Sequence, residues 1–174
     1  MTSSHLKHLT LAVLGALLIA APVSAQVGWS IGGGVTLPQG DAGDGFNSGF
    51  HGMGAATFTL PASPIRVRAD FGYNTMPHKD DALDYNMNIW TVSGDAQWSI
   101  VPGPLSPYLI GGLTWGNLSL GGDEAPDLDS EGDLGFNLGA GLDFGLGPLQ
   151  FFAEARYFML DGTEILPVTL GLRF

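Results

Sequence analysis

The sequence predicts an all-β fold: an eight-stranded antiparallel transmembrane up-and-down β-barrel, preceded by a cleaved signal peptide. Three observations predict it. From residue 27 onward, apolar residues alternate with small or polar ones at a period of two, which is typical of strands whose faces meet different surroundings. Glycine supplies 27 of the 174 residues and is spread along the chain. Short, proline-rich turns alternate with longer polar loops, as they do in outer-membrane barrels.

The first element is the signal peptide, which we assign to residues 1–25. Lys7 precedes an apolar run at residues 9–21, and small residues then lead to a cleavage site after Ala25. A membrane anchor is the alternative, but the run is shorter than the roughly 20 residues that a spanning helix needs. We therefore expect an outer-membrane β-barrel over residues 26–174.

The barrel strands are recognised by their two faces. Between Leu134 and Leu146 every second residue is Leu, Phe or Ala, whereas the residues between them are Gly, Asn or Asp. A helix would mix these two sets, and no helical segment is needed to explain the rest of the chain. The same pattern places strands at residues 27–37, 49–60, 65–74, 87–100, 107–120, 134–146, 149–160 and 165–174.

The connections between these strands also form two classes. The tight turns are residues 61–64, 101–106 and 147–148, and the longer polar loops are 38–48, 75–86 and 121–133, with 161–164 as a short exception among the loops. Outer-membrane barrels have short periplasmic turns and longer external loops, and an even strand number places both termini on one side. We therefore expect both termini in the periplasm.

A soluble barrel or sandwich is the main structural alternative, because alternating strands also build such folds. In a soluble barrel the small, glycine-rich face would have to form the core while the Leu, Phe and Trp face met water. In a membrane the apolar face meets lipid and the small, polar face lines the interior. Closure of the barrel also pairs the backbone hydrogen-bonding groups of every strand edge where water is absent. The pattern therefore favours an apolar exterior and a narrow, polar interior.

Charged residues within the strands all fall on the faces predicted to point inward. A Lys or Arg on the lipid face near the midplane would cost about 2–4 kcal/mol. Buried charges need partners to offset their desolvation, so we expect a neutral, internally paired lumen. The predicted lumen charge cluster is Arg66, Arg68, Asp70, Asp95, Asp143, Glu154, Arg156 and Arg173.

The predicted external loops are strongly acidic. They hold the remaining 13 of the 17 carboxylates, with Lys79 as the only opposing side chain, and the whole chain has a formal net charge of −11. Such a surface argues against nucleic acid as a partner.

Catalytic chemistry has few candidate residues in this chain. After the signal peptide the only histidines are His51 and His78, neither has a convincing serine partner, and there is no cysteine. We expect no catalytic residues, no enzyme activity and no cofactor.

A calcium-like pattern lies in the third long loop, where Asp127, Asp129, Glu131 and Asp133 offer oxygen ligands at alternate positions. An EF-hand loop that began at Asp127 would need Glu at its twelfth position, which Leu138 occupies. The full EF-hand motif is therefore absent. These four residues are candidates only for weak binding of a divalent cation, and the alternative is an acidic loop that is simply solvated.

The end of the chain carries the most specific family signal. Phe174 is preceded at alternate positions by Leu172, Leu170 and Val168, which resembles the terminal strand signal read by the barrel assembly machinery of Gram-negative bacteria. Pro107-Tyr108-Leu109, leading into two glycines, is similar to a fifth-strand opening common in such barrels. Residues 26–174 thus resemble the eight-stranded OmpA/OmpX-type membrane domain. No peptidoglycan-binding module follows Phe174, so we do not expect anchoring through one.

This resemblance implies a place in the cell outer membrane, with outer-membrane lipid, lipopolysaccharide and the barrel assembly machinery as partners. We expect a monomer with a structural or surface-interaction role and an unidentified external partner. One alternative is a narrow, porin-like channel or a path for a small hydrophobic ligand, as in OmpW-like barrels. Tyr108, Ile110, Phe152 and Phe158 would obstruct that path. The other alternative, a lipid A-modifying enzyme, lacks a recognisable site.

Overall fold

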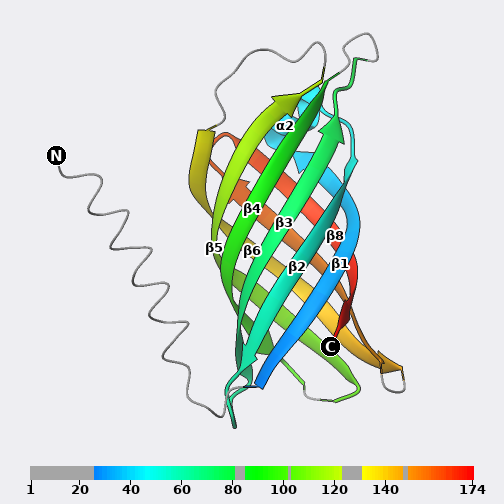
Figure 1. Cartoon of the computed structure of the whole chain (residues 1–174), viewed down its shortest axis with the longest axis vertical. Coiled ribbons are helices and arrows are strands. Elements are labelled where there is room, and N and C mark those ends of the chain that lie inside the picture. The colour runs from blue at the N-terminus through cyan, green and yellow to red at the C-terminus, as the bar shows by residue number, and fades with distance from the viewer. Residues whose placement is uncertain (1–25, 81–84, 102, 123–130, 147–148) are drawn as a thin grey trace, which may run out of the picture.

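The computed structural model describes residues 26–80, 85–101, 103–122, 131–146 and 149–174. The predicted signal peptide lies outside these residues. The strands are β1 (Gln26–Gln39), β2 (Gly49–Thr59), β3 (Ile65–Pro77), β4 (Asn86–Ser99), β5 (Leu105–Gly121), β6 (Glu131–Leu146), β7 (Leu149–Leu160) and β8 (Thr163–Arg173). They form one closed barrel in which every strand pairs with its sequence neighbours (Figure 1). The prediction of an eight-stranded antiparallel up-and-down barrel is confirmed.

Closure of the barrel depends on the pairing of the first and last strands. β1 and β8 are antiparallel, in a register that runs from Ser30 opposite Arg173 to Gln39 opposite Glu164. Beyond it, Trp29 and Phe174 exchange two backbone hydrogen bonds, of 2.7 and 2.8 Å. The sheet therefore has no unpaired edge, as a strand structure in hydrocarbon requires.

The first long connection departs from the predicted loop, because it contains a short helix, α2 (Gly40–Gly45). Gly40 has a φ of +54°, a left-handed conformation that ends β1 and that glycine adopts without steric cost. Ala42 is then buried against side chains inside the barrel. No alternating or helical pattern marks so short a helix in the sequence; its burial against the strands accounts for it. No helix in the described ranges is long and apolar enough to cross a membrane.

We call the end of the barrel that carries this helix the α2 end and the opposite end, with the short connections, the turn end (Figure 1). Six strands, β1, β3, β4, β5, β6 and β8, extend beyond a predicted limit at one or both ends, by one to three residues. The largest changes are at the α2 end, where β3 continues to Pro77 and β6 begins at Glu131. Backbone pairing continues there although the alternating pattern in the sequence has stopped.

The two faces of the sheet differ as the alternation predicts. Leu134 is 69% exposed on the outer face of β6, whereas Arg68, Gln97 and Thr114 are fully buried in the lumen. Below α2 the lumen is apolar, which differs from the polar interior expected from the sequence. This apolar layer consists of Ala42, Met76, Met87, Ile89, Phe158 and Ile165.

Glycines on the inner face give room to large side chains on the neighbouring strand. Gly141 lies opposite Tyr108, and a Cβ atom at Gly141 would come within 2.3 Å of the Tyr108 ring. Gly171 lies opposite Phe152 and would meet that ring at the same distance. The high glycine content therefore lets aromatic rings lie against the barrel wall.

We expect Gly141→Ala to lower the free energy of unfolding by about 1–3 kcal/mol, because the added methyl group overlaps Tyr108. Gly54→Ala is the matched control, since a Cβ atom there has no neighbour within 4 Å. Urea unfolding in lipid vesicles, followed by tryptophan fluorescence, measures both variants. Equal losses in the two variants would contradict this account of the inner glycines.

Candidate functional site

The most distinctive site in the barrel is a network of buried charges halfway along the lumen, which we call the central network. Arg68 on β3 donates two parallel hydrogen bonds, both of 2.8 Å, to the two carboxylate oxygens of Glu154 on β7. These strands are four apart in an eight-stranded ring, so they face each other across the lumen. The Arg68–Glu154 pair therefore bridges the full width of the barrel.

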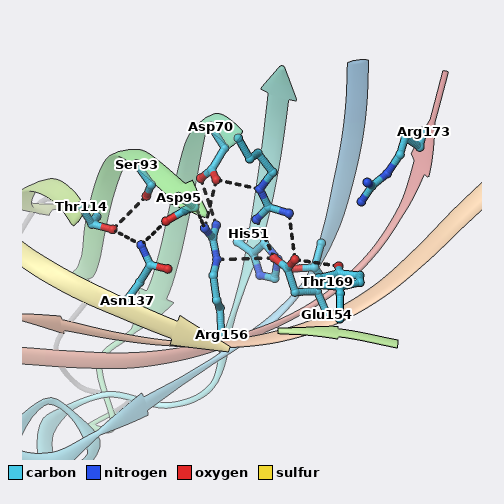
Figure 2. A network of polar contacts seen from close by, with 12 residues as sticks. His51, Asp70, Ser93, Asp95, Thr114, Asn137, Glu154, Arg156, Thr169 and Arg173 are labelled. Atoms are coloured by element: carbon cyan, nitrogen blue, oxygen red, sulfur yellow. Dashed lines mark hydrogen bonds and ion pairs between the residues drawn. The ribbon is translucent and has the colours of Figure 1, made fainter. Parts of the chain in front are cut away.

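A second arginine ties the remaining carboxylates to this bridge. Arg156 donates hydrogen bonds of 3.0 and 2.9 Å to Asp70 and one of 2.6 Å to Asp95. Arg68 also donates through its Nε atom to Asp70, at 3.1 Å. Two guanidinium groups thus meet three carboxylates in one continuous network (Figure 2).

Neutral side chains complete the hydrogen bonding of these carboxylates. The Tyr108 hydroxyl donates to Glu154 at 2.8 Å. The Asn137 amide donates to both Asp95 and Thr114 at 2.7 Å, and Thr114 contacts Ser93 at 2.9 Å (Figure 2). Charge-assisted and bidentate hydrogen bonds of this kind hold a fixed geometry, so the network closes the middle of the lumen with ordered side chains.

The remaining predicted lumen charges form a separate group toward the turn end. Arg66 donates to Asp143 at 2.6 Å and to Ser99 at 3.2 Å. Arg173 lies 3.0 Å from the other oxygen of Asp143. In Figure 2, Arg173 stands apart from the central network. The eight residues predicted as one cluster therefore occupy two levels of the lumen.

The two candidate histidines lie in different surroundings. The ring nitrogens of His51 contact the hydroxyl groups of Thr36, at 3.0 Å, and Thr169, at 2.8 Å, and Thr36 in turn donates to Asn74. His78 lies at the α2 end and makes ring contacts with Phe46 and Tyr85. Neither the hydroxyl contacts of His51 nor the ring contacts of His78 supply the serine and carboxylate that a hydrolytic triad needs.

Half of the candidate divalent ligands, Asp127 and Asp129, lie outside the described residues. Glu131 and Asp133 lie in the first residues of β6. Within the described ranges, no group of three His, Cys, Asp or Glu side chains is placed to hold a metal ion. Weak divalent binding by this loop therefore stays a prediction.

The predicted assembly signal lies on the outer face of the barrel. Val168, Leu170 and Leu172 belong to β8 and, like Phe174 beyond its end, are exposed on the apolar surface. β8 pairs with both β7 and β1, so this strand closes the ring.

Sequence reasoning placed Tyr108 in the lumen and Asn137 on an inward strand face, but it did not identify the neutral residues as hydrogen-bond partners of the charges. Strand alternation alone points Asn137, Thr114 and Ser93 inward. Their hydrogen bonds to one another depend on the register of β4, β5 and β6, which no local pattern reveals.

The closed barrel, with its apolar outer face and ion-paired interior, defines an integral β-barrel protein of the outer membrane. A model of the outer membrane protein beta-barrel domain matches residues 9–166, and the chain belongs to that family. No curated relative matches the sequence.

Solved structures agree on the fold. Neisserial surface protein A is similar with a TM-score of 0.68 and 14% identity, over 86% of this chain and 97% of that protein. A major outer membrane protein from Thermus thermophilus is similar with a TM-score of 0.62 and 16% identity, over 87% of this chain and 98% of that protein. Ail, the attachment invasion locus protein of Yersinia pestis, is similar with a TM-score of 0.57 and 19% identity, over 85% of this chain and 97% of that protein. At these identities the likeness concerns the fold.

We expect Glu154→Gln to lower the free energy of unfolding by about 3–5 kcal/mol, because it removes the carboxylate charge that pairs with both terminal nitrogens of the buried Arg68 and leaves only the Nε contact with Asp70. Asp161→Asn removes an exposed negative charge and should change it by less than about 0.5 kcal/mol. Urea unfolding in vesicles compares the two variants. A loss at Glu154 no larger than that at Asp161 would show that the bridge does not hold the barrel together.

Proposed function

We propose that this protein is a non-enzymatic outer-membrane barrel with a structural and surface-interaction role, and that its acidic loops face the cell exterior. The observation that carries the proposal is the Arg68–Glu154 bridge, which crosses the lumen and supports a scaffold rather than a pore. In this orientation the turn end and both termini lie in the periplasm. Outer-membrane lipid, lipopolysaccharide and the assembly machinery are the partners that the barrel itself requires, and it acts as a monomer.

Two successive obstructions along the lumen argue against ion conduction through the barrel. The central network fills the middle of the barrel with fully or almost fully buried Arg68, Asp70 and Glu154. The apolar layer, which includes Ala42 of α2, occupies the α2 end. An ion on this path would have to displace both paired charges and apolar side chains. This arrangement favours the scaffold over the narrow-channel and hydrophobic-ligand alternatives.

The surroundings of His51 support the non-enzymatic assignment. Both of its ring nitrogens contact threonine hydroxyl groups inside the barrel. A lipid A-modifying enzyme must present its catalytic groups to a lipid substrate, whereas these groups lie among lumen side chains. The same contacts give His51 a structural role, linking β1, β2 and β8.

The charge of the α2 end supports a cationic external partner. Asp41, Asp44, Asp80 and Asp161 are exposed there. Lys79 is also exposed, and its ammonium group donates a hydrogen bond to the Gly43 carbonyl. A structure of Ail contains the heparin analogue sucrose octasulfate, a polyanion. The acidic loops of this chain would repel such a ligand and attract basic groups instead.

Planar-bilayer recording tests the scaffold proposal. We expect the wild-type barrel to give no steady single-channel current, because the central network and the apolar layer both obstruct the lumen. Heat-modifiable migration in detergent gels serves as the folding control for the inserted protein. Steady unitary currents from folded wild-type protein would overturn the scaffold proposal in favour of the channel.

Binding of a lysine-rich peptide to barrel-containing vesicles tests the surface role. We expect binding that weakens as salt concentration rises and that falls severalfold in the triple variant Asp41→Asn, Asp44→Asn, Asp80→Asn. The matched control changes three exposed outer residues, Val67→Ala, Val92→Ala and Leu113→Ala, and should bind as the wild type does. Heparin should not bind. Peptide binding that is unaffected by the loop substitutions would contradict the acidic loops as the binding surface.

A further inference from the structure

The lumen between the central network and the turn end contains a second group of polar side chains, which we call the turn-end layer. It consists of Ser30, Thr57, Arg66, Gln97, Asp143 and Arg173. Strand register brings them together, because Ser30 lies directly opposite Arg173 and Gln97 lies directly opposite Arg66. Six of the eight strands thus contribute one side chain each to one level of the barrel.

The charges of the two levels do not balance separately. The central network has two arginines and three carboxylates, whereas the turn-end layer has Arg66 and Arg173 with Asp143 alone. Among the described residues, no other carboxylate lies within 4.0 Å of either of these two arginines. The lumen is neutral as a whole, but its turn-end layer keeps an excess of one positive charge.

The same layer contains most of the buried polar groups that lack hydrogen-bond partners. Gln97 is fully buried, and neither its amide nitrogen nor its oxygen has a partner among the described residues. Arg173 has three such nitrogen atoms, because its ion pair with Asp143 is not aligned as a hydrogen bond. The hydroxyl groups of Ser30 and Thr57, the Nε atom of Arg66 and one carboxylate oxygen of Asp143, an acceptor, also lack hydrogen-bond partners. Buried polar groups are normally paired, so this concentration of donors requires an explanation.

Solvent reaches this layer more readily than the central network. The side chains of Arg66, Asp143 and Arg173 are 18%, 14% and 13% exposed, whereas that of Arg68 is fully buried. The Arg173 guanidinium also lies 5.5 Å from the centre of the Phe152 ring, which limits where it can move. The charged side chains of this layer therefore form a partly solvent-accessible, positively charged end of the lumen, next to the buried central network.

We propose that the turn-end layer is a binding site for a small oxyanion of the phosphate class, reached from the periplasmic side in the orientation given above. Planar guanidinium groups match the oxygens of phosphate with paired hydrogen bonds. The Gln97 amide and the hydroxyl groups of Ser30 and Thr57 supply further donors. One bound anion would balance the excess charge of this layer. This site is independent of the surface role of the external loops.

Titration with inorganic phosphate tests the site, using the folded barrel in octyl glucoside micelles, which contain no phosphate. Ionic strength is held constant with chloride, and the side-chain Nε–Hε signals of the arginines are followed by nuclear magnetic resonance. We expect saturable shifts for Arg66 and Arg173. Arg173→Gln should weaken binding about tenfold or more, equivalent to about 1.4 kcal/mol. Lys79→Gln, which removes a positive charge at the α2 end, should bind phosphate as the wild type does.

Asp143→Asn should change the phosphate affinity in the opposite direction. Removal of the carboxylate that pairs with both arginines frees them, so phosphate should bind about tenfold more tightly than in the wild type. If Arg173→Gln fails to show heat-modifiable folding, Gln97→Leu replaces it and should weaken binding severalfold. The proposal is overturned by wild-type shifts that do not saturate or that equal those in chloride, and also by unchanged affinity in Asp143→Asn.

Discussion

Backbone hydrogen bonding inside hydrocarbon is the constraint on which the rest of this structure depends. An unpaired N–H or C=O group would cost several kcal/mol there, so the sheet must close on itself. The chain meets this requirement by pairing β1 with β8 and by joining Trp29 to Phe174 through two backbone hydrogen bonds. Closure with eight strands then sets the width of the lumen.

The width of the lumen determines what its side chains can do. Arg68 and Glu154 are long enough to meet across it, and Tyr108 and Phe152 fit because glycines stand opposite them. A wider barrel would leave the charges solvated, and they would then contribute little to stability. In this barrel they are buried, so each depends on its partners. The narrow lumen thus allows these ion pairs and aromatic contacts to form, and they in turn obstruct it.

The two levels of the lumen and the external surface offer different chemistry. Every charged group of the central network has an ion-pair partner within the network, and these side chains separate the two ends of the lumen. The turn-end layer keeps an excess of donors and positive charge, whereas the α2 end presents exposed carboxylates. The central network lies between these two surfaces.

The sequence by itself determined the number of strands and which way most side chains point, because alternation along a strand is a local property. The run from Leu134 to Leu146 needs no distant residue to show its two faces. Only the tertiary structure decided which inward residues meet. Arg68 and Glu154 are 86 positions apart, and they pair because strand register and barrel closure bring β3 and β7 to opposite walls. The helix α2, the apolar layer beneath it and the unequal division of charge likewise arise from contacts between distant segments, which no local pattern encodes.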